Sequence, residues 1–373
     1  MKKNYYIKTS LSIKVCALFA LTLTLVGCSS KKDTKIFDEN GASKSLFSVS
    51  KVKRVRFSKG NLQYQPYTGI WRFAENQTDA VLEDNSDISP DYDGWIDLFG
   101  WGTSGWNSGA KAYMPYETND DWTAYIPGND TVANLSGEYA NADWGVYNKI
   151  SNGGNEPGIW RTLSYDEWDY LFNRNNGDLI QPVMIVENKL EEEILKNLRN
   201  KVSLEDTTKF WFDSKWFAYF WKYQAKWVKY QGFIIYPDIH NEVSNNDEIA
   251  ILTVREWKKI ERTGAIFLPV TGFRSSDRFC MNDWGYEGVR QTTYKFIGFI
   301  PIKVKFKMNS YGGYYWSSNS IPGYLLNSPS LNTDNIRNSN SSLWVDFQIG
   351  ASRVEQSIHN RNYGMAVRLV MDE

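Results

Sequence analysis

Cysteine and histidine are scarce in this sequence. Its 373 residues include three cysteines and two histidines. Cys16 and Cys28 lie within the first thirty residues, so Cys280 would be the single thiol of the folded body, which excludes an internal disulfide framework. His240 and His359 are too few for a histidine-rich metal centre. We interpret Cys280 as a small hydrophobic side chain and both histidines as ordinary surface or loop residues, and we expect no metal or other cofactor.

A surplus of positive charge is also missing. The formal net charge is -1 and Lys and Arg form no single basic block, so nothing indicates a nucleic-acid partner bound through its phosphates. The sequence contains no Gly-x-Ser-x-Gly elbow, phosphate loop or dinucleotide fingerprint. We therefore expect a protein that is not an enzyme. A carboxylate-based hydrolase stays open, because acids are numerous and their spacing in the fold is invisible in sequence.

Long Leu/Ile/Val runs are rare in the body, whereas aromatic residues are plentiful. They make up 16% of the chain and include 16 Trp. Large rings bury much area each, so a loop-rich protein can build its core from them. We therefore predict one globular body with long loops and short regular elements.

The first residues have the composition of an export signal. Four lysines and no acid precede an apolar run over residues 15–26 that is too short to span a bilayer. The run ends in Leu25, Val26, Gly27 and Cys28, which resemble a bacterial lipobox with Cys28 as the lipidated residue. An ordinary signal peptide cut nearby is the alternative. Removing residues 1–27 would leave 38 basic and 43 acidic residues.

These features predict a signal peptide over residues 1–27, a flexible polar tether over residues 28–45, and one folded domain over residues 46–373. By resemblance to Gram-negative lipoproteins, Ser29 after the cysteine favours the outer membrane. We expect an envelope protein held to the membrane by its lipid, and the sequence is compatible with a periplasmic or a cell-surface orientation.

Alternating patterns predict strands at residues 53–57, 61–65 and 71–74. Two helix starts share one pattern: Ser164 or Thr253 as N-cap, with Glu167 or Glu256 three residues later. Each is a capping box with a hydrophobic staple to a tryptophan, so both glutamates are explained without catalysis. We predict short helices that end near Arg174 and before residue 264.

Four further segments have interpretable patterns. Apolar residues Leu190, Ile194, Leu198 and Val202 predict an amphipathic helix over residues 186–202. The aromatic and cationic residues 210–227 favour packing in the core, with a membrane surface or sugar stacking as alternatives. Residues 225–237 predict a hairpin around a central glycine, and residues 264–272 a buried strand. The acidic residues between 87 and 97 resemble part of a calcium loop, but we interpret them as a solvated turn.

Residues 312–373 open with an aromatic strand and close with a strand over residues 364–370, in which Val and Leu alternate with Arg368. Between them lies a polar excursion, residues 319–362, with a strand candidate at residues 343–347. Asn, Tyr and Trp side chains offer amide hydrogen bonds and flat rings, which suit sugars or protein surfaces. The excursion also contains Asn332 and Asn340. Its candidate ligand-binding residues are Tyr324, Asn327, Asn335, Asn338, Trp344, Arg353, His359 and Arg361.

Seven blocks, read in order, carry a family resemblance: residues 57–64, 71–77, 97–106, 160–168, 267–274, 315–318 and 364–370. The chain resembles a paralogous family of secreted or lipid-anchored proteins from Bacteroidetes and Fibrobacter. That family is similar to the C-type-lectin-like fold of formylglycine-generating sulfatase-modifying enzymes and of the variable proteins of diversity-generating retroelements. The resemblance implies an α+β fold with its first and last strands paired, here residues 52–57 with 365–370, and insertions near residues 182–223 and 288–308.

The enzymes of that fold use a copper-binding cysteine pair or a histidine-rich iron site, and this sequence has the residues for neither. In the retroelement-diversified relatives the corresponding C-terminal region holds the ligand-contacting positions. We therefore expect a non-catalytic binding module, for a glycan or a protein, anchored in the envelope. A structural envelope lipoprotein without a specific ligand is the competing hypothesis.

Overall fold

A strand near the start of the folded body and the strand at its end lie side by side in one sheet. Strand β2 (Arg54–Phe57) pairs antiparallel with β17 (Leu369–Asp372), in the register Val370↔Phe57 and Asp372↔Val55, and the sheet order is β1-β2-β17-β5. The predicted pairing of the two ends is confirmed, but the closing strand, predicted over residues 365–370, spans Leu369–Asp372. Residues 364–366 form isolated bridges to other segments instead.

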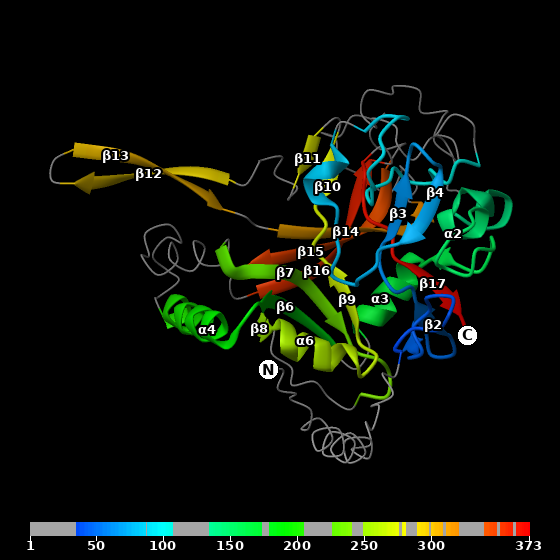
Figure 1. Ribbon diagram of the computed structural model, residues 1–373, viewed down its shortest axis with the longest axis horizontal. Helices are drawn as coiled ribbons and strands as arrows, with labels where there is room; N and C mark the ends of the chain where they lie inside the picture. The colour runs from blue at the N-terminus through cyan, green and yellow to red at the C-terminus, as the bar shows by residue number, and fades with distance from the viewer. Residues whose placement is uncertain are drawn as a thin grey trace, which may run out of the picture. The chain divides into compact units, whose positions relative to one another are not determined.

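The computed structural model describes residues 35–86, 88–106, 134–173, 179–204, 226–240, 249–275, 278–280, 289–297, 300–308, 311–320, 339–348, 351–360 and 363–373. Figure 1 shows their arrangement. The remaining strands are β1 (Phe47–Ser48), β3 (Leu62–Gln65), β4 (Ile70–Phe73), β5 (Arg161–Thr162), β6 (Ile180–Val186), β7 (Val228–Ile235), β8 (Ala250–Thr253), β9 (Ile266–Pro269), β10 (Phe273–Ser275), β11 (Arg278–Cys280), β12 (Val289–Ile297), β13 (Ile300–Met308), β14 (Tyr311–Ser320), β15 (Ser339–Gln348) and β16 (Ala351–Asn360). The helices are η1 (Leu82–Asn85), η4 (Gly137–Ala142), α2 (Trp144–Tyr147), α3 (Tyr165–Asn173), α4 (Lys189–Leu204) and α6 (Val254–Glu261).

Short helices and several separate, mainly antiparallel sheets make the described part an α+β structure. The three strands predicted near the start correspond to β2, β3 and β4. No helix among the described residues is both long and apolar enough to cross a membrane.

A four-stranded sheet in the order β8-β6-β7-β9 is covered on both faces. Along β6, Val183 and Ile185 belong to one core cluster with Trp257 of α6, while Met184 and Val186 belong to another that includes Leu195 of α4. Burial on both faces explains why these strands are apolar runs without polar alternation. The segment 182–223 was predicted to be an insertion. Its first residues, 182–186, lie in β6, a central strand of this sheet, and so belong to the core. Residues 289–308 differ, since β12 and β13 pair only with each other among the described strands.

The hairpin predicted over residues 225–237 is wrong. Residues 228–235 form one continuous strand, β7, which lies between β6 and β9. A Cβ atom on Gly232 would collide with the backbone oxygen of Leu268 and lie 2.7 Å from Cζ of Phe267. Gly232 is therefore explained by the close approach of β9 and not by a turn.

Both predicted capping boxes are present. The Thr253 side chain accepts from the backbone N–H of Glu256, and the Glu256 carboxylate accepts from the backbone N–H of Thr253. Ser164 and Glu167 make the same reciprocal pair at the start of α3, with distances of 3.2 and 2.9 Å. The capping residues alone thus located the start of α3 and α6.

Helix α4 begins three residues later than predicted and presents a different face. Leu190 is 66% exposed, whereas Leu195 is fully buried and Leu198 nearly so. A strict four-residue step drifts around a helix of 3.6 residues per turn. The buried face is therefore centred on Leu195, and Val186 belongs to β6.

The folded body starts earlier than predicted. Ile36–Glu373 form one compact unit, so residues 36–45, assigned above to the tether, belong to the body. Phe37 bridges to Ser43, Ala42 is buried and bridges to Ser58, and Asp38 forms an ion pair with Arg56. These contacts fix the segment against β2.

Strand β14 separates two core clusters. Tyr315 packs with Trp168 and the apolar residues of the first cluster, while Tyr314 and Trp316 pack with Phe99 and other rings of the second. The predicted aromatic strand is thus buried on both faces. It is also the edge of a three-stranded ladder, β14-β15-β16, visible in Figure 1.

Arg368 does not alternate outward, as the sequence pattern indicated. It is 1% exposed, and every residue from Gly364 to Val370 is buried. Its guanidinium donates to Oδ1 of Asn61 at 3.4 Å and to Oε1 of Gln77 at 3.2 Å. Burial lowers the pKa of Arg368 to about 10, and the nearby Tyr315 opposes that shift.

Candidate functional site

Three of the predicted ligand-binding residues lie on strands. Trp344 is on β15, which contains the strand predicted at residues 343–347, and Arg353 and His359 are on β16, where we had expected a loop. Polar and small residues dominate β16, so its sequence carries little strand signal. Cys28, Tyr324, Asn327, Asn332, Asn335, Asn338 and Arg361 lie outside the described residues.

The strand register brings the three residues to one face of the ladder. Arg353 is the Cα partner of Asp346, and His359 is the partner of Asn340. Positions 340, 344 and 346 have the same parity along β15, and directly paired residues share a face. The same face of the β15–β16 pair therefore carries Trp344, Arg353 and His359, at separate positions along the strands.

Strand β14 ties this ladder to the core. Indole Nε1 of Trp316 donates to the backbone oxygen of Phe99 at 2.6 Å, and Nε1 of Trp101 donates to the backbone oxygen of Ser317 at 2.9 Å. The hydroxyl of Tyr315 donates to the Pro269 carbonyl at 2.7 Å. Tyr314 is the register partner of Trp344. The ladder is thus anchored at the strand next to the candidate residues.

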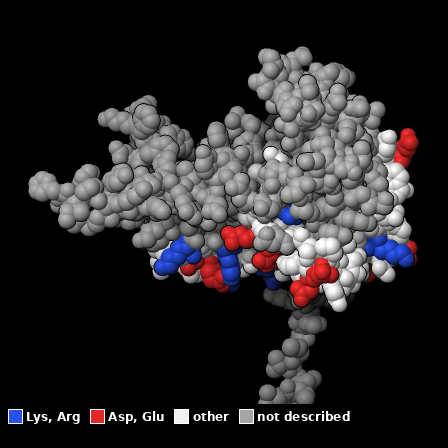
Figure 2. Space-filling model, turned by 90° about the horizontal axis from the view of Figure 1, so that it is seen from above, with Lys and Arg blue, Asp and Glu red and all other residues white. Residues whose placement is uncertain are grey.

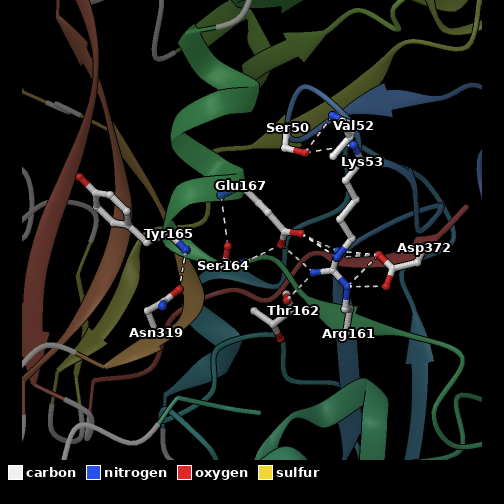
Figure 3. Close-up of polar contacts among 10 residues, drawn as sticks. All are labelled: Ser50, Val52, Lys53, Arg161, Thr162, Ser164, Tyr165, Glu167, Asn319 and Asp372. Atoms are coloured by element: carbon white, nitrogen blue, oxygen red, sulfur yellow. Dashed lines mark hydrogen bonds and ion pairs between the residues drawn. The ribbon is translucent and has the colours of Figure 1, made fainter. Parts of the chain in front are cut away.

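The end of β14 meets the start of α3. Figure 3 shows Asn319 facing the backbone of Tyr165, whose N–H donates to Oδ1 of Asn319 at 2.6 Å. This bond supplements the Ser164 cap, because it satisfies another free N–H of the first helical turn.

An ion network that the sequence did not reveal joins β5, α3 and β17 (Figure 3). Arg161 donates to both carboxylate oxygens of Glu167, at 2.6 and 2.8 Å, and to both oxygens of Asp372, at 2.6 to 3.1 Å. Lys53 adds contacts of 3.1 Å to Glu167 and 3.3 Å to Asp372. We refer to Arg161, Glu167, Asp372 and Lys53 as the Arg161 clasp.

The two carboxylates of the clasp are held in their charged form. Burial alone would raise the pKa of Glu167, but hydrogen bonds and charge from Arg161 outweigh it, so the pKa lies below its usual value. Asp372 is shifted downward by the same balance. Arg161 and Lys53 both pair with Glu167 and Asp372, so the clasp fastens β17 to β5 and α3.

Replacing Arg161 with leucine should lower the free energy of unfolding by about 1 to 2 kcal/mol at pH 7, because half-exposed Asp372 is partly screened by solvent. The lowered pKa values mean that this stability exists above the ordinary Asp and Glu pKa values, about 4, and is lost as pH falls through the folded values. Urea titrations at pH 7 and pH 3 should therefore show the difference from wild type shrinking in acid.

The exposed pair Arg54–Glu373, 2.9 Å apart, is the matched control. Arg54→Leu should change stability by less than about 0.5 kcal/mol, since exposed ion pairs contribute little. A pH-independent loss for Arg161→Leu would contradict the assignment.

Two other carboxyls are buried and used internally. Asp97 accepts from the backbone N–H of Val81 and from Nδ2 of Asn85, both at 2.8 Å. Asp143 accepts from the N–H groups of Gly145 and Thr162, at 3.0 and 2.8 Å. Burial raises the pKa of each to about 6, against the lowering effect of these donors.

The acidic segment that we interpreted as a solvated turn therefore contains both buried and exposed acids. Asp97 is buried and fixes the start of η1, while Asp91 and Asp93 are exposed and Asp87 lies outside the described residues. Within the described ranges, no group of three or more His, Cys, Asp or Glu side chains converges as a metal site. His240 contacts Oγ1 of Thr263 at 3.0 Å.

Of the four tryptophans between residues 83 and 126, the three that the structure describes differ in their burial. Trp101 is fully buried and Trp106 packs at the edge of the second core cluster. Trp122 lies outside the described residues. Trp95 is partly exposed and belongs to none of the three core clusters. The guanidinium carbon of Arg72 lies 3.7 Å from its ring centroid.

Charges of both signs are interspersed on the described part of the surface seen in Figure 2. No protein-family model, no curated protein and no solved structure matches this chain. The function must therefore be argued from its own residues.

Proposed function

We propose that this chain is an envelope-anchored lipoprotein, lipidated at Cys28, that binds a glycan or protein ligand without catalysis. In this proposal its body has the C-type-lectin-like fold of the formylglycine-generating-enzyme type. The binding surface is the face of β15 and β16 that carries Trp344, Arg353 and His359, together with the predicted residues that flank these strands.

One observation carries the binding proposal: the register that assigns the residues Trp344, Arg353 and His359 to the same face of a ladder. Trp and Arg are enriched among the residues that dominate binding energy, because they combine large contact area with hydrogen-bonding groups. A ladder anchored through β14 offers such residues a preorganised frame, which lowers the entropy cost of binding.

The fold assignment is supported by features that its family resemblance implied. The strands near the two ends of the body pair as β2 and β17, and the aromatic block 315–318 is a buried strand. A non-catalytic role is supported by the state of Asp97 and Asp143. Both carboxyls accept backbone hydrogen bonds inside the protein and are occupied in holding loops.

Binding should fail when this face is altered. We expect Trp344→Ala and Arg353→Ala each to weaken ligand binding at least tenfold, since interface hot spots of these types typically contribute 2 kcal/mol or more. The measurement is binding of the full-length chain in detergent, first to an array of immobilised glycans and then to solubilised envelope proteins of the organism that makes it. Gln356→Ala is the matched control, because Gln356 pairs with Leu343 and so lies on the opposite face.

Equal loss in the Gln356 variant would refute the assignment of the face. An absence of any ligand, together with unchanged stability of the Trp344 and Arg353 variants, would favour a structural envelope lipoprotein instead.

A further inference from the structure

The hairpin β3–β4 carries a surface that the proposed ligand face does not include. Its inner side chains, among them Leu62, Trp71 and Phe73, pack in the second core cluster. The opposite face bears the Gln63–Arg72 and Gln65–Ile70 pairs. Residues 92–96 lie beside this hairpin, because Tyr67 N–H donates to the Tyr92 carbonyl at 3.0 Å and Ile96 bridges to Tyr64.

Trp95 is placed differently from the other tryptophans of the protein. Of the tryptophans whose side chains the structure describes, it alone lies outside all three core clusters. A tryptophan is costly to leave partly in water, because its ring can bury 150 to 250 Å². Trp95 is instead stacked on the guanidinium of Arg72, which fixes the orientation of the ring.

Arg72 is itself held in position. Its Nε donates to Oε1 of Gln63 at 2.9 Å, and Nη1 lies 3.9 Å from Glu75, beyond hydrogen-bond distance. Within the described part of the chain, its two terminal nitrogens have no hydrogen-bond acceptor. The Arg72 side chain is 26% exposed, so those donors are available to a ligand.

Further rings and acceptors border this pair. Tyr67 at the tip of the hairpin is 68% exposed and Ile70 is 43% exposed. Tyr92 covers Gly94, where a Cβ atom would collide with the Tyr92 ring. Asp93 is exposed next to Trp95. The hairpin and residues 92–96 beside it thus carry flat rings, guanidinium donors and a carboxylate acceptor.

We propose that Trp95, Arg72, Tyr67 and Asp93 form a second binding site, which takes an uncharged pyranose unit of a glycan. The sugar ring stacks on the indole face turned away from Arg72. Its hydroxyls accept from the terminal nitrogens of Arg72 and donate to the Asp93 carboxylate, because a hydroxyl can do both.

Size and charge select this ligand over others. A protein partner requires about 800 Å² of surface with an apolar centre, and the large apolar side chains exposed on this hairpin are Tyr67 and Ile70 alone. Asp91 and Asp93 are exposed around the site and Glu75 is already paired with Lys59, so the two exposed aspartates would repel an acidic sugar. A neutral sugar satisfies the polar groups without that cost.

The test measures binding of the full-length chain in detergent to an array of neutral hexopyranose oligosaccharides, with uronic-acid oligosaccharides beside them. We expect binding to neutral members, weakened at least tenfold by Trp95→Ala and less by Trp95→Phe, which keeps a ring. Tyr67→Ala should also weaken binding. Because Tyr67 is exposed, its replacement should leave the fold intact, so a loss of binding would not reflect misfolding. Tyr147→Ala, a 42% exposed tyrosine outside this site, is the matched control.

Several outcomes would overturn the proposal: no bound neutral glycan at millimolar concentration, preference for uronic acids, capture of a protein by the same residues, or equal loss with Tyr147→Ala. Trp344→Ala separates the two sites. Binding that is lost with Trp344→Ala but kept with Trp95→Ala would leave the ligand face on β15–β16 intact and refute this one.

Discussion

Replacing Gly232 with alanine is expected to lower the free energy of unfolding by about 3 kcal/mol. The added methyl group would collide with the backbone oxygen of Leu268 on β9 and press on the Phe267 ring. A flexible side chain could turn away, but a strand backbone in a sheet buried on both faces cannot move without breaking its ladder. Chemical denaturation followed by tryptophan fluorescence would measure the loss.

The control is Gly158→Ala. Gly158 has φ +81 and nothing within 4 Å of an added Cβ atom, so only backbone strain of about 1 kcal/mol is expected. If Gly232→Ala cost no more than Gly158→Ala, the close approach of β7 and β9 would be refuted, and the hairpin predicted from sequence would regain support.

Replacing Gln77 with leucine is expected to cost about 3 kcal/mol. Its amide nitrogen donates to Glu261 and to the Ala265 carbonyl, and its oxygen accepts from the Phe267 N–H and from Arg368. Leucine would leave a buried guanidinium with Asn61 as its one remaining hydrogen-bond acceptor among the described residues. An unpaired buried charge is among the most destabilising defects in a core.

A double-mutant cycle with Arg368→Met tests the cause. When the buried cation is absent, Gln77→Leu should cost at least 1 kcal/mol less than in the wild-type background, because the charge no longer lacks a partner. Thermal unfolding of the four proteins would show it. Additive losses would mean that Gln77 acts through the backbone groups of Ala265 and Phe267 and not through Arg368.

How much of the fold was predictable follows from how local each signal is. The starts of α3 and α6 were found because a capping box lies within four residues of sequence. The role of Gly232 was missed because it depends on Leu268, a residue of another strand. The burial of Arg368 was missed for the same reason, since Asn61 and Gln77 lie 307 and 291 positions away.

The candidate site was predictable in residue type more than in structure. Trp344, Arg353 and His359 were selected for their chemistry. A strand was predicted at residues 343–347, but the rest of β15 and all of β16 are mainly polar and lack the apolar alternation from which a strand is predicted. Their common face follows from register, which a single sequence does not contain. The sequence did not single out Trp95, because Trp composition alone cannot distinguish a ring in the core from one stacked on Arg72.

The position of β17 between β2 and β5 bears on how the chain is made. Until residues 369–372 leave the ribosome, both neighbouring strands lack the partner that joins them. The nascent protein therefore cannot complete this sheet before β17 is made, and a product truncated before Leu369 would expose two open strand edges to aggregation.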